Sequence, residues 1–397
     1  MFFPLDFSVE SVKFSRKTVL LNKINLLRGK SREMDWNMER KLRAGVIGLG
    51  MGCNHVRGYR NHPDVELVAV ADIDPERLQE RGVNDLKVPA CYSTAEEMLE
   101  KEQLDIVSVA VPNCVHKDLT IKALKAGANV LCEKPMAMNE AEALEMLETA
   151  KKCNRKLGIN FSYRFLNQSR EMKKIVDQGG VGEIYYAQTN WFRRKGIPGM
   201  EQGNFNSPGA AGRWFFDKEM SGGGPLIDLG VHRLDFCLWM MGYPEPEWVM
   251  GSTYDKLGPR MAAEKNRVFT VEDLAAAMIR FKNGATLQIV ASWASHVKEQ
   301  ELMNARLLGT EGGLLQFNIN EGYEFRIEHY FDNAGQSYDS MPHNLPAETY
   351  LNSYYEFADS VAKDRPFLVQ PEEGVTVMRI LDAIYESAKS GVPVKLG

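Results

Sequence analysis

Cysteine is scarce in this 397-residue chain, and the few cysteines follow no metal-binding pattern. They form no CxxC pair and show no spacing typical of zinc ligands. Several fall inside predicted apolar strands or helices, where buried free thiols in a reducing compartment are expected. We therefore expect a cytoplasmic protein without a metal site. The six residues are Cys53, Cys91, Cys114, Cys132, Cys153 and Cys237.

Long hydrophobic runs and a strong excess of one charge are also missing. No apolar stretch is long enough to span a bilayer. The apolar segment Val19–Leu27 is interrupted by Asn22, Lys23 and Asn25, which makes it a poor signal-peptide core. The net charge of −5 and the isoelectric point of about 5.9 argue against polyanionic partners. We expect neither nucleic acid nor a membrane as a partner.

The stretch Leu42–His55 (LRAGVIGLGMGCNH) organises the first half of the chain. Ala44–Ile47 is a short apolar run typical of a buried parallel strand, and Gly48, Gly50 and Gly52 follow it. Glycine tolerates φ > 0 in a tight turn and lets a phosphate approach the backbone. The following helix would direct free N–H groups at a pyrophosphate. Taken alone, the stretch is also compatible with a glycine-rich turn that binds nothing.

A second apolar strand, Glu66–Ala71, ends at Asp72. This acid lies 20 residues after Gly52, where a dinucleotide-binding fold places the carboxylate that binds the adenosine ribose. Strands continue to alternate with helices up to residue 162, which predicts a doubly wound parallel sheet. Ligands of such sheets bind beyond the strand C-termini, so the residues that follow the strands should line one crevice. These are Gly48–Gly52, Asp72, Pro112–Asn113 and Glu133–Lys134.

The pattern changes after Gln168, where long β-rich segments begin. A polar loop at 193–221 precedes a strongly apolar helix, Pro225–Met241. Ala275–Phe281 and Ala285–Trp293 flank Asn283–Gly284, the strongest short hairpin signal. Since the chain is too long for one compact core, we predict three segments. These are a disordered extension at 1–40, a dinucleotide-binding domain at 41–162, and an α+β domain with a large, mostly antiparallel sheet at 163–397.

Two groups of residues could carry chemistry. Lys134 follows a buried strand beside the proposed nicotinamide site and could hold a substrate hydroxyl; a solvated loop lysine is the alternative. Asp228 and His232 lie four residues apart on an apolar helix, after the glycine run Gly222–Gly224. They are either a satisfied core pair or a general base with its orienting carboxylate. Asp235 extends the same face and could be structural.

The motifs resemble those of the Gfo/Idh/MocA family (glucose–fructose oxidoreductase and inositol dehydrogenase). They occur in the family's order and cover about residues 42–397. The glycine turn is one residue shorter than GxGxxGxxH, and the segment 1–40 has no counterpart. The matching stretches are GLGMGCNH at 48–55, ADID at 71–74, VPNCVH at 111–116, AGANVLCEKP at 126–135, YRF at 163–165 and GGGPLIDLGVHRLD at 222–235.

The resemblance implies an N-terminal Rossmann domain and a C-terminal sheet that also makes oligomer contacts in a homodimer or homotetramer. It implies NAD-dependent oxidation or reduction at a carbinol of a sugar or inositol, with Lys134, Asp228 and His232 as catalytic residues. We expect His232 to be the base, with a pKa near the working pH and its tautomer fixed by Asp228. NAD is expected over NADP because Asp72 repels a 2′-phosphate, although Arg77 lies nearby.

The expected ligand contacts complete this prediction, and no metal is among them. Expected cofactor contacts are Gly48, Leu49, Gly50, Met51, Gly52, Asp72, Ile73, Pro112, Asn113, His116, Glu133, Lys134 and Arg164. Expected substrate contacts are Lys134, Tyr163, Arg164, Trp191, Trp214, Asp228 and His232. For the two tryptophans, ordinary packing is an equal alternative.

Two other functions remain open from the sequence. One is a redox-neutral lyase or glycosidase that oxidises and re-reduces its substrate with a trapped NAD. The other is a non-catalytic, nucleotide-sensing regulator, against which the presence of Lys134, Asp228 and His232 counts. The sugar or polyol itself depends on the loop 193–221, for which spacing offers no rule.

Overall fold

The apolar runs of the first half form a six-stranded sheet in which every pairing is parallel. The computed structural model describes residues 40–200, 209–343, 345 and 352–397, and Leu42–Gly397 is one compact unit. The strand order β3-β2-β1-β4-β5-β6 is that of a dinucleotide-binding sheet. The strands are β1 (Leu42–Ile47), β2 (Val65–Ala71), β3 (Ala90–Tyr92), β4 (Ile106–Val109), β5 (Asn129–Cys132) and β6 (Leu157–Ile159).

Helices connect these strands, and two of them begin at a capping side chain. The Thr94 side chain accepts from the Glu97 N–H at 3.2 Å, and Asn139 accepts from the Glu142 N–H at 2.9 Å. The helix that begins at Pro75 passes into a π-helical segment after one turn. The elements are α2 (Gly52–Arg60), α3 (Pro75–Arg77), η1 (Leu78–Asp85), α4 (Ala95–Lys101), η2 (Asn113–Val115), α5 (His116–Lys125) and α6 (Glu140–Cys153).

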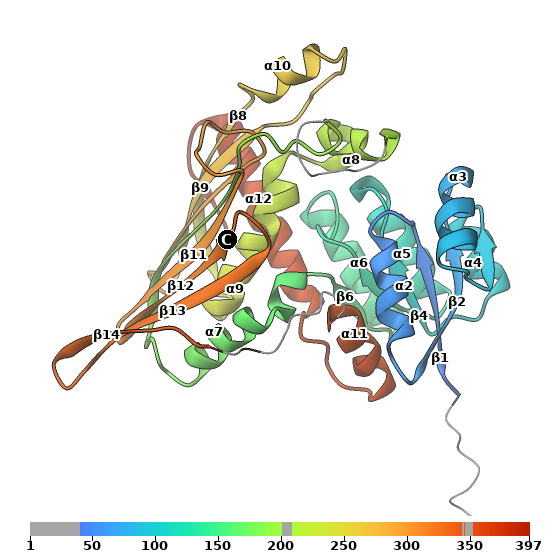
Figure 1. The fold of residues 1–397 in the computed structure, drawn as a ribbon, viewed down its shortest axis with the longest axis horizontal. Coiled ribbons are helices and arrows are strands. Elements are labelled where there is room, and N and C mark those ends of the chain that lie inside the picture. Colours follow the sequence, from blue (N-terminus) through green and yellow to red (C-terminus); the bar gives the residue numbers. More distant parts are fainter. Residues whose placement is uncertain (1–39, 201–208, 344, 346–351) are drawn as a thin grey trace, which may run out of the picture. The chain divides into compact units, whose positions relative to one another are not determined.

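The second half forms a nine-stranded sheet of order β14-β13-β12-β11-β7-β10-β9-β8-β15 (Figure 1). It is antiparallel except for the β10–β7 pair. The predicted hairpin at Asn283–Gly284 joins β9 to β10, with Gly284 at φ +91°. The strands are β7 (Ile184–Arg193), β8 (Pro246–Tyr254), β9 (Leu274–Phe281), β10 (Thr286–Ser292), β11 (Glu301–Gly309), β12 (Gly312–Ile319), β13 (Glu324–Asn333), β14 (Gln336–Ser340) and β15 (Val394–Lys395).

Helices α9 and α12 pack against this sheet, and α12 also contacts α6 and β6 of the first half (Figure 1). The fold class is therefore the predicted one. The remaining elements are η3 (Ser162–Phe165), α7 (Asn167–Asp177), η4 (Gly209–Phe216), α8 (Lys218–Ser221), η5 (Leu226–Gly230), α9 (Val231–Met240), α10 (Gly258–Ala263), α11 (Asn352–Ala362) and α12 (Pro371–Ser390). The expected extension falls at 1–39, outside the described residues, as do positions 201–208 of the polar loop.

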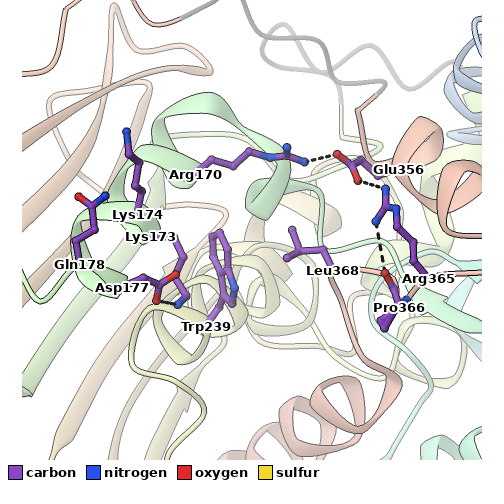
Figure 2. A pocket seen from close by; sticks show the side chains of 10 residues that line it. All are labelled: Arg170, Lys173, Lys174, Asp177, Gln178, Trp239, Glu356, Arg365, Pro366 and Leu368. Atoms are coloured by element: carbon purple, nitrogen blue, oxygen red, sulfur yellow. Dashed lines mark hydrogen bonds and ion pairs between the residues drawn. The ribbon is translucent and has the colours of Figure 1, made fainter. Parts of the chain in front are cut away.

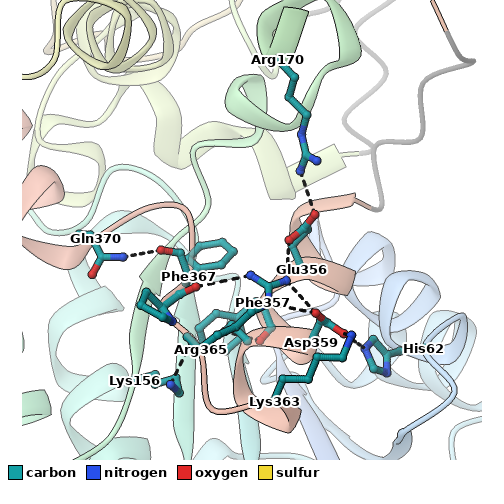
Figure 3. Close-up of polar contacts among 12 residues, drawn as sticks. His62, Lys156, Arg170, Glu356, Phe357, Asp359, Lys363, Arg365, Phe367 and Gln370 are labelled. Carbon is teal, nitrogen blue, oxygen red and sulfur yellow. Dashed lines mark hydrogen bonds and ion pairs between the residues drawn. The ribbon is translucent and has the colours of Figure 1, made fainter. Parts of the chain in front are cut away.

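Helix α11 packs against the parallel-sheet half of the protein, although it lies near the C-terminal end of the sequence. Asp359 is 3.8 Å from His62 after α2, and it also accepts from Arg365 at 2.7 Å (Figure 3). Lys156, just before β6, donates to the Arg365 carbonyl at 3.1 Å. Phe357 lies over Gly158 of β6. Side chains therefore pack across the predicted boundary between the domains 41–162 and 163–397. The division into these two domains stays a prediction.

Candidate active site

The glycine turn after β1 has the geometry of a phosphate cradle. Gly48 has φ +89°, and a Cβ there would lie 2.2 Å from the Ala110 carbonyl oxygen. A Cβ at Gly50 would meet no atom within 4 Å, so the backbone borders open space there. Helix α2 begins directly afterwards, and no side chain caps its N-terminus at Met51. A pyrophosphate therefore fits at this turn, with the first N–H groups of α2 as donors.

Asp72 follows β2 and lies beside the glycine turn, as predicted. Its carboxylate accepts from the Leu49 N–H at 2.7 Å and from the Asp74 N–H at 2.9 Å. Arg77 lies 3.3 Å from Asp72 and 2.7 Å from Asp74. The neighbouring Ile73 is 87% exposed, whereas the Asp72 side chain is only 1% exposed. The carboxylate of Asp72 is thus buried and hydrogen-bonded, with Arg77 beside it, at the strand end where a dinucleotide-binding fold places the ribose-binding acid.

Among the expected cofactor contacts, His116 and Glu133 have buried side chains that are already hydrogen-bonded within the protein. His116 is fully buried, and its ring nitrogens bond to the carbonyls of Pro135 and Val111 at 2.8 and 2.9 Å. Glu133 accepts from the His55 ring and from the Asn160 amide, both at 2.8 Å. Through these hydrogen bonds, both side chains stabilise the segment that follows β5, which contains Lys134. Both ring nitrogens of His116 are thus occupied within the protein, and the ring is closed to a cofactor.

The Lys134 and Asp228 side chains meet across the two halves of the chain. Lys134 Nζ donates to Asp228 Oδ1 at 3.0 Å and to the Asp228 carbonyl at 2.8 Å. The other carboxylate oxygen, Oδ2, accepts from the indole N–H of Trp293 at 3.0 Å. Burial would raise the pKa of Asp228, but the charges of Lys134 and Arg193 and these hydrogen bonds outweigh it and lower that pKa. Asp228 is therefore an ionised partner of Lys134.

His232 lies on the same helical segment but forms no hydrogen bond with Asp228 among the described residues. Its buried Nδ1 has no partner there, so the expected tautomer-fixing pair is wrong for this structure. The segment η5, which holds Asp228, is a π-helical turn, so four residues no longer bring two side chains together as in an α-helix. Burial, then the charges of Lys134, Arg233 and Arg193, lowers the pKa of His232 well below its ordinary value. The ring is neutral, not poised near pH 7.

The glycine run before η5 serves packing instead of ligand approach. A Cβ at Gly223 would lie 2.0 Å from the Tyr385 hydroxyl, and one at Gly224 would lie 2.1 Å from the Glu272 carbonyl. Glu272 accepts from the Gly224 N–H at 2.9 Å and the Leu226 N–H at 3.2 Å, and so caps the segment. Packing therefore requires glycine at both positions. Their small size lets Glu272 and Tyr385 anchor the start of η5.

Arg164 is fully buried in an ion-pair network, which contradicts its expected contact with cofactor or substrate. Its guanidinium binds both oxygens of Asp235, at 3.0 and 2.6 Å. It also donates to Glu373 at 2.8 Å and to the Tyr243 hydroxyl at 2.7 Å. These bonds tie η3 to α9 and α12. The open question about Asp235 is thereby answered, because it is a structural partner of Arg164.

Aromatic rings surround His232. The Tyr163 ring lies 5.0 Å away and the Trp191 ring 6.2 Å away, between ring centroids. Trp191 is buried and donates to Glu301 at 2.6 Å, so it forms the wall of the site with its indole N–H already used. Trp214 instead stacks on Phe215 at 3.9 Å, and no contact of Trp214 with Lys134, Asp228 or His232 is found in the described part of the chain.

Sequence reasoning missed four residues behind this wall. Glu301 accepts from Arg193 at 3.0 Å and from the Tyr323 hydroxyl at 3.1 Å, besides Trp191. Trp293, the residue on Asp228, follows β10 and is fully buried. Arg193 ends β7, Glu301 begins β11, and Trp293 and Tyr323 each lie next to a strand end of the large sheet. No spacing along the chain marks these four residues as neighbours. The sequence offered one indication of these residues, the predicted strand Ala285–Trp293, whose last residue is Trp293.

A cavity of about 580 Å³ lies elsewhere, near the far end of α9 (Figure 2). It holds none of the predicted site residues. Lys173 lies over the Trp239 ring at 5.9 Å and pairs with Asp177. Arg170 and Arg365 both bind Glu356, at 3.0 and 2.8 Å. Its cations are thus already paired, and we place the chemistry at Lys134, Asp228 and His232 instead.

The described residues hold no group of three or more histidine, cysteine or acidic side chains that could bind a metal ion. All six cysteines are free, as predicted. Within the same residues, no helix has the length and apolar character that a membrane crossing needs.

Comparison with known proteins agrees with this geometry. Residues 42–161 match the model of an oxidoreductase family with an NAD-binding Rossmann fold, and 173–396 match its C-terminal alpha/beta domain. The D-glucoside 3-dehydrogenase of Escherichia coli strain K12 is 31% identical, over 89% of this chain and 97% of that protein. The myo-inositol 2-dehydrogenase of Thermotoga maritima is 26% identical, over 89% and 98%.

The solved structure of levoglucosan dehydrogenase in complex with NADH shares the fold. Its TM-score is 0.77 at 22% identity, covering 90% of this chain and 99% of that one. The two matched domains, in the order in which the sequence places their motifs, show that this chain belongs to the Gfo/Idh/MocA family of NAD-binding oxidoreductases.

Proposed function

We propose that the protein oxidises a carbinol of a sugar, sugar derivative or inositol, with NAD as hydride acceptor. The observation that carries this proposal is the ion pair of Lys134 with Asp228, near enough to His232 for the Lys134 charge to add to burial in lowering the pKa of its ring. Lys134 comes from the end of β5, Asp228 from η5 and the neutral His232 from the start of α9. Relatives named as D-glucoside 3-dehydrogenase and myo-inositol 2-dehydrogenase support the substrate class.

The cofactor is proposed to lie along the C-terminal ends of β1, β2 and β5. The turn Gly48–Gly52, which borders open space at Gly50, would hold the pyrophosphate, and Asp72 would accept from the adenosine ribose. Met51 and Ile73 are exposed beside these groups and border the adenosine. Bound NAD supplies the acceptor for the hydride that leaves the carbinol carbon.

The side chains have separate roles in this scheme. His232 accepts the hydroxyl proton, because its ring is neutral and uncharged nitrogen is the acceptor that the reaction needs. Lys134 holds the same hydroxyl and stabilises the negative charge that develops on its oxygen. Asp228 keeps the ammonium of Lys134 in place through the 3.0 Å bond. The buried rings of Trp191 and Tyr163 pack on one side of the His232 ring.

The test is a screen of sugars and inositols for NADH formation. We expect one class of carbinol to give NADH that accumulates with turnover. An enzyme that recycles a trapped NAD would consume substrate without accumulating NADH, and a nucleotide sensor would bind NAD without consuming any substrate. Absence of turnover with all sugars and inositols, while NAD still binds, would contradict the proposal.

Two further features belong to the same proposal, a homo-oligomer and a cytoplasmic location. The alternating burial along β10 and β11 leaves one face of the large sheet half-exposed, which a second copy could cover. Six free cysteines fit a reducing compartment. Light scattering at micromolar concentration tests the first point, since a mass near 44.8 kDa would mean a monomer.

A further inference from the structure

Trp293 lies outside the catalytic residues proposed above, but it touches one of them. Its indole nitrogen is 3.0 Å from Asp228 Oδ2, while Lys134 holds Oδ1 at the same distance. An indole N–H can only donate, so this bond needs an acceptor on the Asp228 side. Both oxygens of the Asp228 carboxylate therefore accept a hydrogen bond. One donor is the Lys134 ammonium, which follows a strand of the parallel sheet, and the other is the neutral indole of Trp293, which follows a strand of the large sheet.

The indole is held in a fixed position by the large sheet. Trp293 is fully buried, and its backbone N–H donates to the Asp273 carbonyl at 3.0 Å. Its own carbonyl accepts from the Gly196 N–H at 2.8 Å. The preceding strand β10 lies between β7 and β9 inside the sheet. The donor is thus fixed by a central strand, whereas Lys134 is a long side chain that needs a partner to fix it.

We propose that Trp293 is a positioning residue for the reaction. Through its hydrogen bond to Asp228 it sets the rotation of that carboxylate, and thereby the place of the Lys134 ammonium at the substrate hydroxyl. This inference rests on the proposed function. It assigns the residue a role through Asp228, with no contact to substrate or cofactor. Asp228 then acts as the link between the rigid sheet and the lysine of the nucleotide-binding half.

The first test does not use activity. In protein labelled with ¹⁵N-tryptophan, the indole resonance of Trp293 is assigned by its loss in Trp293→Phe. Asp228→Ala removes the acceptor, so that resonance should move, while the Trp248 indole in β8 should stay in place. Where Trp293→Phe folds poorly, the Trp293 resonance is assigned by elimination, from Trp→Phe variants at the other five tryptophans, and Asp228→Ala still reports on the hydrogen bond. An unchanged Trp293 resonance would refute the hydrogen bond and the proposal.

The second test is a double-mutant cycle on kcat. Hydrogen bonds to charged groups contribute enough for an expected loss of about 10- to 100-fold in kcat in Trp293→Phe, with the Kd for NAD unchanged. In an Asp228→Ala background the same change should cost less than about 3-fold, because the residues act in one chain of contacts. The control Trp248→Phe removes an indole from the same sheet and should leave kcat unchanged.

Other outcomes distinguish failure of the positioning role of Trp293 from failure of the proposed function. A full loss in both backgrounds would show that Trp293 acts by packing alone and would overturn the positioning role, as would wild-type kcat in Trp293→Phe. Absence of turnover by the wild-type protein with every sugar and inositol would instead refute the proposed function. The indole measurement would then still decide whether Trp293 holds Asp228.

Discussion

His232 is a histidine that its surroundings keep neutral. Burial first, then three neighbouring cations, lowers the pKa of its ring well below the ordinary value of 6.5. A base must be unprotonated to work, so a lowered pKa extends activity towards acid. We expect kcat/KM for carbinol oxidation to stay level as pH falls through 6.5 and to decline only below it. A decline centred on 6.5 would contradict this ring as the base in the environment described.

Removal of the base should separate chemistry from binding. His232→Ala should lower kcat by about 10²- to 10⁴-fold, the usual contribution of a general base, with little change in the Kd for NAD. Lys134→Ala should cost at least as much, since it removes both charge and position. The exposed His343 provides the control, because His343→Ala should leave kcat unchanged. If His232→Ala kept most of its kcat, Lys134 would become the candidate base.

We expect Asp72 to determine which dinucleotide is preferred. Its carboxylate and a 2′-phosphate would repel by on the order of 1–4 kcal/mol near a surface. Asp72→Ser removes that repulsion and leaves Arg77 free of its 3.3 Å contact. We expect the ratio of kcat/KM for NADP to that for NAD to rise at least about 10-fold. Asp64→Ser, which removes an equal charge just before β2, should leave the ratio unchanged.

The glycine turn before α2 divides two tasks between neighbouring glycines. Gly48 has φ +89° and no room for a Cβ, whereas Gly50 lies outside the left-handed region and borders open space. Gly48→Ala should therefore destabilise folding, by at least about 1–3 kcal/mol for the backbone strain. Gly50→Ala should leave Tm unchanged and raise the Kd for NAD at least about 10-fold, because a methyl group fills the phosphate cradle. The reverse pattern would mean that the cradle lies elsewhere.

At the scale of the whole molecule, Arg164 joins elements that are far apart in sequence. Its removal would leave Asp235 and Glu373 without their cation in the interior, and breaking such a buried pair costs about 3–5 kcal/mol. We expect Arg164→Leu to lower the free energy of unfolding in urea by that amount. Arg170→Leu is the control, since its ion pair with Glu356 is partly exposed and should cost about 0–1 kcal/mol. Equal losses would contradict the structural role.

The local sequence determined the elements and their order. Apolar runs, capping residues such as Thr94 and Asn139, and the Asn283–Gly284 turn depend on neighbours within a few residues, so their patterns are readable along the chain. The same holds for Gly48, Gly50 and Asp72, because the end of a parallel strand fixes which edge of the sheet a residue reaches. Lys134 and Asp228 also met as the motif order indicated.

Tertiary structure alone decided the partners of those residues. Asp228 binds Lys134 and Trp293 instead of His232, because a π-helical turn changes the spacing and the large sheet brings an indole to the free oxygen. Arg164 and His116 lie in the interior, where their donors meet carboxylates and carbonyls far away in sequence. Contacts of this kind depend on how sheets and helices stack in space. Local sequence patterns do not specify how sheets and helices pack against each other. The roles of these side chains therefore became clear only in the folded structure.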